Sequence, residues 1–292
     1  MNNIIERKWE RRCSPYQYAF EYAAVVGNKA ATQYFLQKLT SREREESLVR
    51  YAGYVANRRC NSAGNKTDFP KEHYADVLCF LLSQINEEQQ IEVFKSYPYE
   101  VLKCLLDWPW QSLFMETANR MWDFLSEENY DFLLRIIVDK VMDGYKDYNY
   151  QNLFEEFWQQ SPNAHKRYVI DECANGFLLS KLFVIKDEKS IKLILKDATL
   201  VEKEKLIFCD RGKYICQDLI NGAEWDLLEF FIRECVPSKN EVIKFKREFE
   251  QRITRWCPKG ESRRTQVKWD KFFQLLDDFI NGYDNKEKYV RR

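Results

Sequence analysis

A short apolar motif recurs along the chain: two large or apolar residues, two variable residues, then two more apolar residues. The clearest copies are residues 227–232 (LLEFFI), 153–158 (LFEEFW) and 77–82 (VLCFLL). Apolar positions at i, i+1, i+4 and i+5 lie on one side of a helix, in a stripe about one third of its circumference wide. Each copy therefore predicts a helix with one buried face.

Weaker copies of the motif fill the intervals between these three. The second position of each copy serves as a marker, and the markers are Thr32, Leu78, Phe114, Phe154, Ile191, Leu228 and Leu276. Successive markers are 46, 36, 40, 37, 37 and 48 residues apart. The two long intervals each contain a polar insertion, at 61–70 (NSAGNKTDFP) and 258–264 (PKGESRR). A period near 38 residues is typical of a repeat array, in which stacked units bury one another's apolar faces.

Each interval has room for a second helix. We expect one at 41–56, with Thr40 or Ser41 as N-cap, one at 99–107 opened by Pro98, and one at 130–142 that starts from Ser126. The predicted fold class is therefore all-α, a solenoid of stacked helical hairpins. We divide the chain into an N-terminal helical cap (1–13), the repeat array (14–258) and a C-terminal capping helix with a basic tail (259–292).

Two segments carry a family resemblance. Residues 20–28 (FEYAAVVGN) resemble the inner helix and tight turn of an ankyrin repeat, and residues 219–232 resemble the same unit with Ala223 in place of the turn residue Gly27. A third, looser copy lies at 105–114. The chain is similar to divergent, arthropod-type ankyrin-like arrays, which implies a protein-binding role. It departs from the family by lacking a Thr-Pro-Leu-His tetrapeptide and by having units longer than 33 residues, so other helical-hairpin solenoids remain an alternative.

Composition agrees with a folded helical protein. Hydrophobic residues make up 45% of the chain and aromatic residues 15%, whereas only 9 Gly and 7 Pro interrupt it. Basic and acidic residues number 46 each, so no global field attracts nucleic acid, and acidic residues interleave with the basic clusters at both ends. We expect neither nucleic-acid nor membrane binding. The start of the chain lacks the apolar core of a signal peptide, and we expect a cytoplasmic protein.

The residues that could carry chemistry form no catalytic pattern. The two histidines, His73 and His165, have no metal-ligand spacing around them, and we expect both to be exposed. The nine cysteines form no CxxC pair, and we expect Cys79, Cys104, Cys216 and Cys235 to be buried as small apolar side chains. Cys209 and Cys216 flank Gly212, where we expect a helix to break. No catalytic residue, cofactor or metal is predicted.

Aromatic residues crowd the middle of the chain more densely than one buried stripe per helix requires. Exposed Trp and Tyr side chains dominate the energetics of many interfaces. We therefore expect some of these residues to line a partner-binding groove, and the candidates are Trp108, Trp110, Tyr145, Tyr148, Tyr150 and Trp158.

The leading functional hypothesis is a non-enzymatic scaffold that binds a protein partner on a curved helical-repeat surface. The alternatives are an effector or toxin-like helical module, or an enzyme whose site is assembled from distant residues. The partner's identity and the oligomeric state stay open at this stage.

Overall fold

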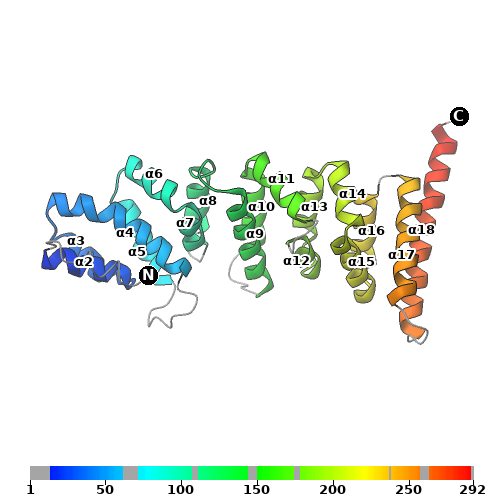
Figure 1. The fold of residues 1–292 in the computed structure, drawn as a ribbon, viewed down its shortest axis with the longest axis horizontal. Coiled ribbons are helices and arrows are strands. Elements are labelled where there is room, and N and C mark those ends of the chain that lie inside the picture. Colours follow the sequence, from blue (N-terminus) through cyan, green and yellow to red (C-terminus); the bar gives the residue numbers. More distant parts are fainter. Residues whose placement is uncertain are drawn as a thin grey trace. The chain divides into compact units, whose positions relative to one another are not determined.

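The computed structural model describes residues 14–61, 72–106, 111–143, 150–173, 178–236, 238–256 and 263–290, and every regular element within these ranges is an α-helix (Figure 1). The all-α prediction is confirmed. The chain divides into two compact units, Met1–Leu133 (unit 1) and Leu134–Arg292 (unit 2), with the boundary inside one helix. Both predicted domain boundaries, after residue 13 and after residue 258, lie at or within segments outside the described residues.

Unit 1 is organised around one long helix. Its helices are α2 (Pro15–Val25), α3 (Lys29–Leu36), α4 (Ser41–Asn61), α5 (Glu72–Ser83), α6 (Glu87–Ser96), α7 (Pro98–Leu105) and α8 (Gln111–Asn119), and α9 (Glu127–Met142) crosses the boundary. Helix α4 packs against α2, α5, α6 and α7. As predicted, helices begin at Ser41 and Pro98 and one follows Ser126, because each start has a capping side chain or a proline that suits a first turn.

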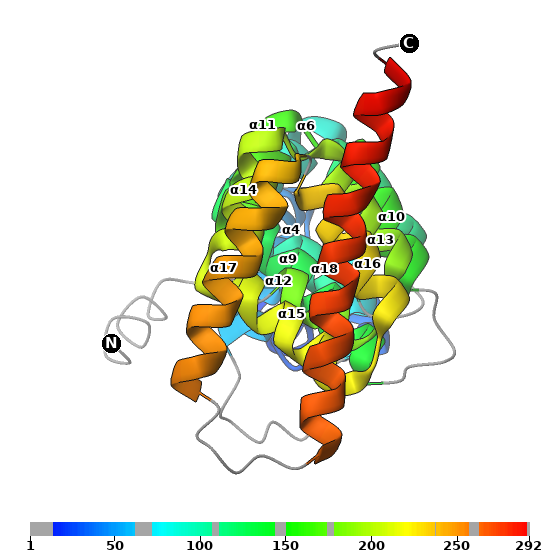
Figure 2. The ribbon, with the colours of Figure 1, turned by 90° about the vertical axis from the view of Figure 1, so that its right-hand side faces the viewer.

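Unit 2 repeats one packing pattern. Its helices are α10 (Tyr150–Gln160), α11 (Asn163–Cys173), α12 (Leu178–Val184), α13 (Glu188–Asp197), α14 (Leu200–Phe208), α15 (Asp210–Gly222), α16 (Trp225–Cys235), α17 (Lys239–Trp256) and α18 (Arg263–Val290). Helix α13 packs between α10 and α16, and α15 packs between α12 and α18. Helix α14 packs against α11, α15 and α16, and α17 lies beside α18 (Figure 2).

All seven marker residues lie on helices and are buried, each with at most 1% of its surface exposed. Their helices are α3, α5, α8, α10, α13, α16 and α18. The apolar motif therefore identified the buried face of a helix at all seven marker positions, including those where the copy was weak. Thr32 is the polar exception, and its hydroxyl donates a hydrogen bond to the carbonyl oxygen of Asn28 (2.7 Å), which satisfies it inside the core.

Three turns with positive φ precede marker helices. They are centred on Gly27 (φ 76°), Lys186 (φ 56°) and Ala223 (φ 60°), and each lies five residues before a marker. In all three, the residue with positive φ donates to a carbonyl three residues back, and the next residue donates to a carbonyl five residues back. This is the bonding of a Schellman C-cap, which ends a helix in the left-handed conformation. Ala223 thus takes the backbone role of Gly27, as the sequence comparison predicted.

In several places a capped helix follows the marker helix. Serine, threonine or asparagine pairs with a Glu or Gln three residues later, as in a capping box, at Thr40–Glu43, Asn86–Gln89, Thr199–Glu202 and Ser238–Glu241. In unit 2, Cys209 alone separates α14 from α15, and its extended backbone (φ −69°, ψ 163°) breaks the helix.

Candidate functional site

Of the six aromatic residues expected to line a groove, two belong to the core. Tyr150 is 2% exposed and Trp158 is fully buried on α10, whereas Trp108, Trp110, Tyr145 and Tyr148 lie outside the described residues. Trp158 follows the marker Phe154 by one helical turn, and their rings stack with centroids 6.2 Å apart. The two buried rings therefore pack within unit 2 and are not available to a partner, which corrects the expectation for them.

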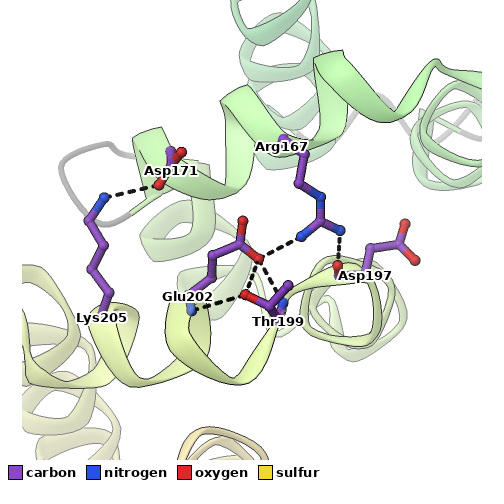
Figure 3. A network of polar contacts seen from close by, with 6 residues as sticks. All are labelled: Arg167, Asp171, Asp197, Thr199, Glu202 and Lys205. Carbon is purple, nitrogen blue, oxygen red and sulfur yellow. Dashed lines mark hydrogen bonds and ion pairs between the residues drawn. The ribbon is translucent and has the colours of Figure 1, made fainter.

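The indole of Trp158 takes part in a polar network between α10, α11 and α13. Its Nε1 donates to Oδ2 of Asp197 (2.9 Å), and the Lys166 ammonium lies 3.5 Å from the same carboxylate. Arg167 on α11 reaches the same region, where one guanidinium nitrogen lies 2.5 Å from Oε2 of Glu202 and the other donates to the main-chain carbonyl of Asp197 (Figure 3).

One carboxylate oxygen of Glu202 makes several contacts in this network. Its Oε2 also accepts hydrogen bonds from the main-chain N–H (2.6 Å) and hydroxyl (2.7 Å) of Thr199, the N-cap of α14. An outer ion pair joins Lys205 to Asp171 at 3.0 Å (Figure 3). A general acid or base needs a proton-transfer site that faces a substrate. Here the carboxylate oxygen faces a cap and a guanidinium, so the arrangement fixes α11 against α13 and α14.

The buried carboxylate of Asp187 joins α10 to α13. Asp187 caps α13 by accepting from the Ser190 N–H (3.2 Å) and hydroxyl (2.7 Å). The Gln151 side chain on α10 donates to the same carboxylate at 2.6 Å. The cap therefore satisfies a buried charge and also ties α10 to the turn at Lys186.

Ion pairs in unit 2 join side chains at a similar separation along the sequence. They join side chains 31 to 40 residues apart: Lys189–Glu155, Lys205–Asp171, Lys203–Glu234, Lys213–Glu248, Lys186–Glu224, Lys244–Glu204 and Lys246–Asp277. This separation is close to the period of the apolar motif. Many of the charged side chains in unit 2 thus link helices that are 31 to 40 residues apart in the sequence.

The buried thiols are poor nucleophiles. Burial, with a smaller contribution from the nearby Cys104 thiol, raises the pKa of Cys79 to about 12, and burial also raises the pKa of Cys216 and Cys235. A thiol, unlike a thiolate, is a weak nucleophile at neutral pH. The predicted burial is confirmed for Cys104, Cys216 and Cys235, whereas Cys79 is partly exposed.

Two sequence expectations need correction. The helix does not break at Gly212, which lies inside α15; it breaks at Cys209, whose Sγ accepts the Gly212 N–H at 3.2 Å as the N-cap. A Cβ at Gly212 would lie 2.0 Å from the Leu206 carbonyl oxygen, so glycine allows α14 and α15 to meet closely at the break. His165 on α11 is buried, not exposed, and the His73 side chain lies outside the described residues.

The described ranges contain no group of three or more His, Cys, Asp or Glu side chains that could hold a metal ion. Among the helices in those ranges, none has an apolar stretch long enough to cross a bilayer.

Exposed apolar side chains identify two surfaces that the sequence interpretation missed. Leu200 (63% exposed) and Val201 (76% exposed) occupy the first turn of α14, next to its N-cap Thr199. Tyr18 and Tyr22 are exposed one turn apart on α2. The capping box at Thr199–Glu202 could have indicated the first surface from the sequence, because a capping box predicts that Leu200 and Val201 begin a helix.

No protein-family model and no curated protein sequence matches this chain.

Proposed function

We propose that the chain is a non-enzymatic binding scaffold, a solenoid of stacked helical hairpins that resembles ankyrin arrays and holds a protein partner. The observation that carries this proposal is the repetition of one turn. At Gly27, Lys186 and Ala223, the same two backbone hydrogen bonds precede a buried marker by the same five residues. A recurring turn at a fixed distance from a buried helix face is what a stacked repeat requires.

The packing of unit 2 supports the same proposal. Marker helices α10, α13 and α16 contact one another in order, as do α12, α15 and α18. Helices α11 and α14 occupy the connection for which an ankyrin repeat uses a loop, so the array is a divergent one. The cross-repeat ion pairs and the buried caps give the charged residues a structural use, which favours a scaffold over an enzyme.

The partner surface that we propose is centred on Leu200 and Val201. Both side chains are largely exposed, and the hydrogen-bonded cap of α14 and the Arg167–Glu202 ion pair hold this turn in place. A preformed apolar contact loses little conformational entropy on binding, which favours its use at an interface. Scattered exposed apolar residues are common, so this surface requires a direct test.

That test is affinity capture of partners by the full chain, with quantitative mass spectrometry. We expect the double variant Leu200→Asp/Val201→Asp to lose a partner that the parent chain captures. Val267→Asp on α18, which is also exposed (60%) in the parent, should retain it. Far-UV circular dichroism must show that both variants keep the parent's helix content.

Equal capture by both variants would exclude this surface but leave the scaffold open. The scaffold itself would be contradicted by saturable turnover of a substrate. A compact globule in small-angle X-ray scattering would contradict the solenoid.

A further inference from the structure

The first turn of α14 differs in composition from the first turns of the other helices that are capped in the same way. Helices α4, α6, α14 and α17 each follow a capping box. In three of them the first two residues are polar, and these residues are Ser41, Arg42, Glu87, Glu88, Lys239 and Asn240. In α14 the first two residues are Leu200 and Val201. A capped first turn of this kind therefore forms without apolar side chains at these two positions.

The packing of the chain does not account for this apolar pair. Leu200 is 63% exposed and Val201 is 76% exposed, so neither side chain contributes much buried area to the fold. An acidic residue, such as Glu87 in α6, interacts favourably with the helix dipole at the same position. Two exposed apolar side chains in a place where polar ones suit the helix better indicate contact with another molecule.

The carboxylates beside this turn are already neutralised. Three of them belong to the last turn of α13 and to α14, and each has a cationic partner at an N···O distance of 3.5, 2.5 or 3.5 Å: Asp197 with Lys166, Glu202 with Arg167 (Figure 3), and Glu204 with Lys244. The negative charge of this segment is therefore matched within unit 2.

The lysines of the same segment are not all matched. Lys203 pairs with Glu234, and Lys205 pairs with Asp171. Lys196, in the last turn of α13 and four residues before Leu200, is exposed and forms no ion pair with any residue that the structure describes. The N-terminus of α14 adds the positive end of a helix dipole. The segment together with its ion-pair partners thus carries a net positive charge next to the apolar pair.

We propose that this surface binds an acidic segment of a partner protein, with apolar side chains against Leu200 and Val201 and a carboxylate against Lys196. The inference rests on the scaffold function proposed above and gives the chemistry of the partner at the same surface. Burial of the apolar side chains supplies affinity, whereas the charge selects among partners of similar apolar content. A basic segment would meet Lys196 with a like charge, which disfavours it.

The test selects dodecapeptides from a random display library on the full chain, with counter-selection against the variant Leu200→Asp/Val201→Asp. We expect the peptides that bind only the parent to be net negative. In fluorescence anisotropy, Lys196→Glu should weaken their binding about fivefold, and replacing one peptide glutamate by lysine should restore part of that loss. Lys38→Glu in unit 1 makes the same charge change at another exposed lysine and should leave the affinity unchanged.

The outcomes separate this inference from the scaffold proposal. Parent-specific peptides without an excess of acidic residues, or acidic peptides whose affinity Lys196→Glu leaves unchanged, would overturn the inference and leave the surface in place. If every selected peptide bound the double variant as well as the parent, the surface itself would be excluded.

Phosphatidylserine vesicles are the second probe. Vesicle binding that the double variant loses, with no acidic peptide selected, would overturn the inference and assign the surface to a lipid headgroup. Far-UV circular dichroism shows whether the variants keep the parent's helix content. If the double variant does not, Val201→Asp replaces it in the counter-selection, with the same expected loss of binding.

Discussion

The two units differ in the helical segment that follows a marker helix, which is continuous in unit 1 and divided in unit 2. In unit 1, α4 follows α3 and runs unbroken through 21 residues, contacting four other helices. In unit 2, the corresponding stretch after α13 is divided by Cys209 into α14 and α15. The unbroken helix buries one face, which carries Leu48, Tyr51 and Val55, whereas Lys203, Lys205 and Lys213 of the divided segment form ion pairs with neighbouring helices.

In both units the same left-handed turn precedes a marker helix, at Gly27 and at Lys186, whereas the segment that follows the marker helix differs. Two main-chain segments approach each other closely where the helix divides. Gly212 serves that approach in unit 2, whereas Gly53 on α4 accommodates a side chain, the ring of Tyr97. Five predictions test the two units.

The largest effect is expected from Gly212→Ala. The new Cβ would meet the Leu206 carbonyl oxygen at 2.0 Å and the Ile207 Cα at 2.8 Å, and neither main-chain atom can move without shifting α14. We expect a loss of about 3 kcal/mol in the free energy of unfolding, seen in urea unfolding and as faster amide exchange in α14 and α15.

Gly53→Ala is the matched change in unit 1. Its Cβ would meet the Tyr97 ring at 2.4 Å, but this partly exposed ring can rotate away, so we expect a loss of about 1 kcal/mol. Gly282→Ala, where no atom lies within 4 Å, serves as the control. Equal losses at Gly212 and Gly53 would remove the distinction between a divided and a continuous helix.

Alkaline pH should weaken unit 1 through Cys79. Below pH 9 its thiol is protonated in both the folded and unfolded states. Above pH 9 the unfolded chain releases this proton, while the folded chain keeps it up to about pH 12. Stability therefore falls as pH rises, by on the order of 1 kcal/mol per unit between those limits. In urea unfolding at pH 8, 9 and 10.5, the free energy of unfolding should decline less for Cys79→Ala than for the parent chain. Parallel declines would contradict a raised pKa of the Cys79 thiol.

The positive-φ turns should respond in opposite directions to exchanging glycine and alanine. Ala223→Gly relieves a left-handed alanine and should stabilise unit 2 by up to about 1 kcal/mol, whereas Gly27→Ala should destabilise unit 1 by about 1 kcal/mol. Thermal unfolding measures both. If Ala223→Gly destabilises, the two turns are not equivalent in energy.

The smallest effect is expected at a single ion pair between two helices of unit 2. Lys203 and Glu234 join α14 to α16 at 3.0 Å, and the Lys203 side chain is mostly buried. A double-mutant cycle with Lys203→Met and Glu234→Gln should give a coupling of about 0.5 kcal/mol that decreases in 1 M salt. A coupling energy that 1 M salt leaves unchanged would mean that the interaction between α14 and α16 at this pair is not electrostatic.

The helices were predicted best where one helix face is buried, because burial imposes a regular spacing of apolar residues. Leu78, Phe114 and Phe154 were placed correctly because a buried helix face repeats its apolar positions. Ala223 was recognised as a turn from its neighbours, whereas Lys186 was missed because no glycine marks it.

Surface properties were predicted poorly. Aromatic density suggested that Trp158 lines a groove, although its position one turn after the marker Phe154 already indicated the core. Composition reports how much aromatic material a chain has but not which face of a helix carries it. His165 was assigned to the surface from its polar neighbours, whereas the helix that follows Ser161 turns this residue inward.

The one-residue division at Cys209 also bears on how such a chain tolerates change in length. A residue gained or lost between a turn and its marker would rotate the buried face of that helix by about 100°. A residue gained or lost at the joint between α14 and α15 would displace Gly212 from its close approach to the Leu206 carbonyl oxygen, so we expect this joint also to tolerate little change in length. The uneven spacing of the markers arises elsewhere, because the two longest intervals contain the polar insertions at 61–70 and 258–264.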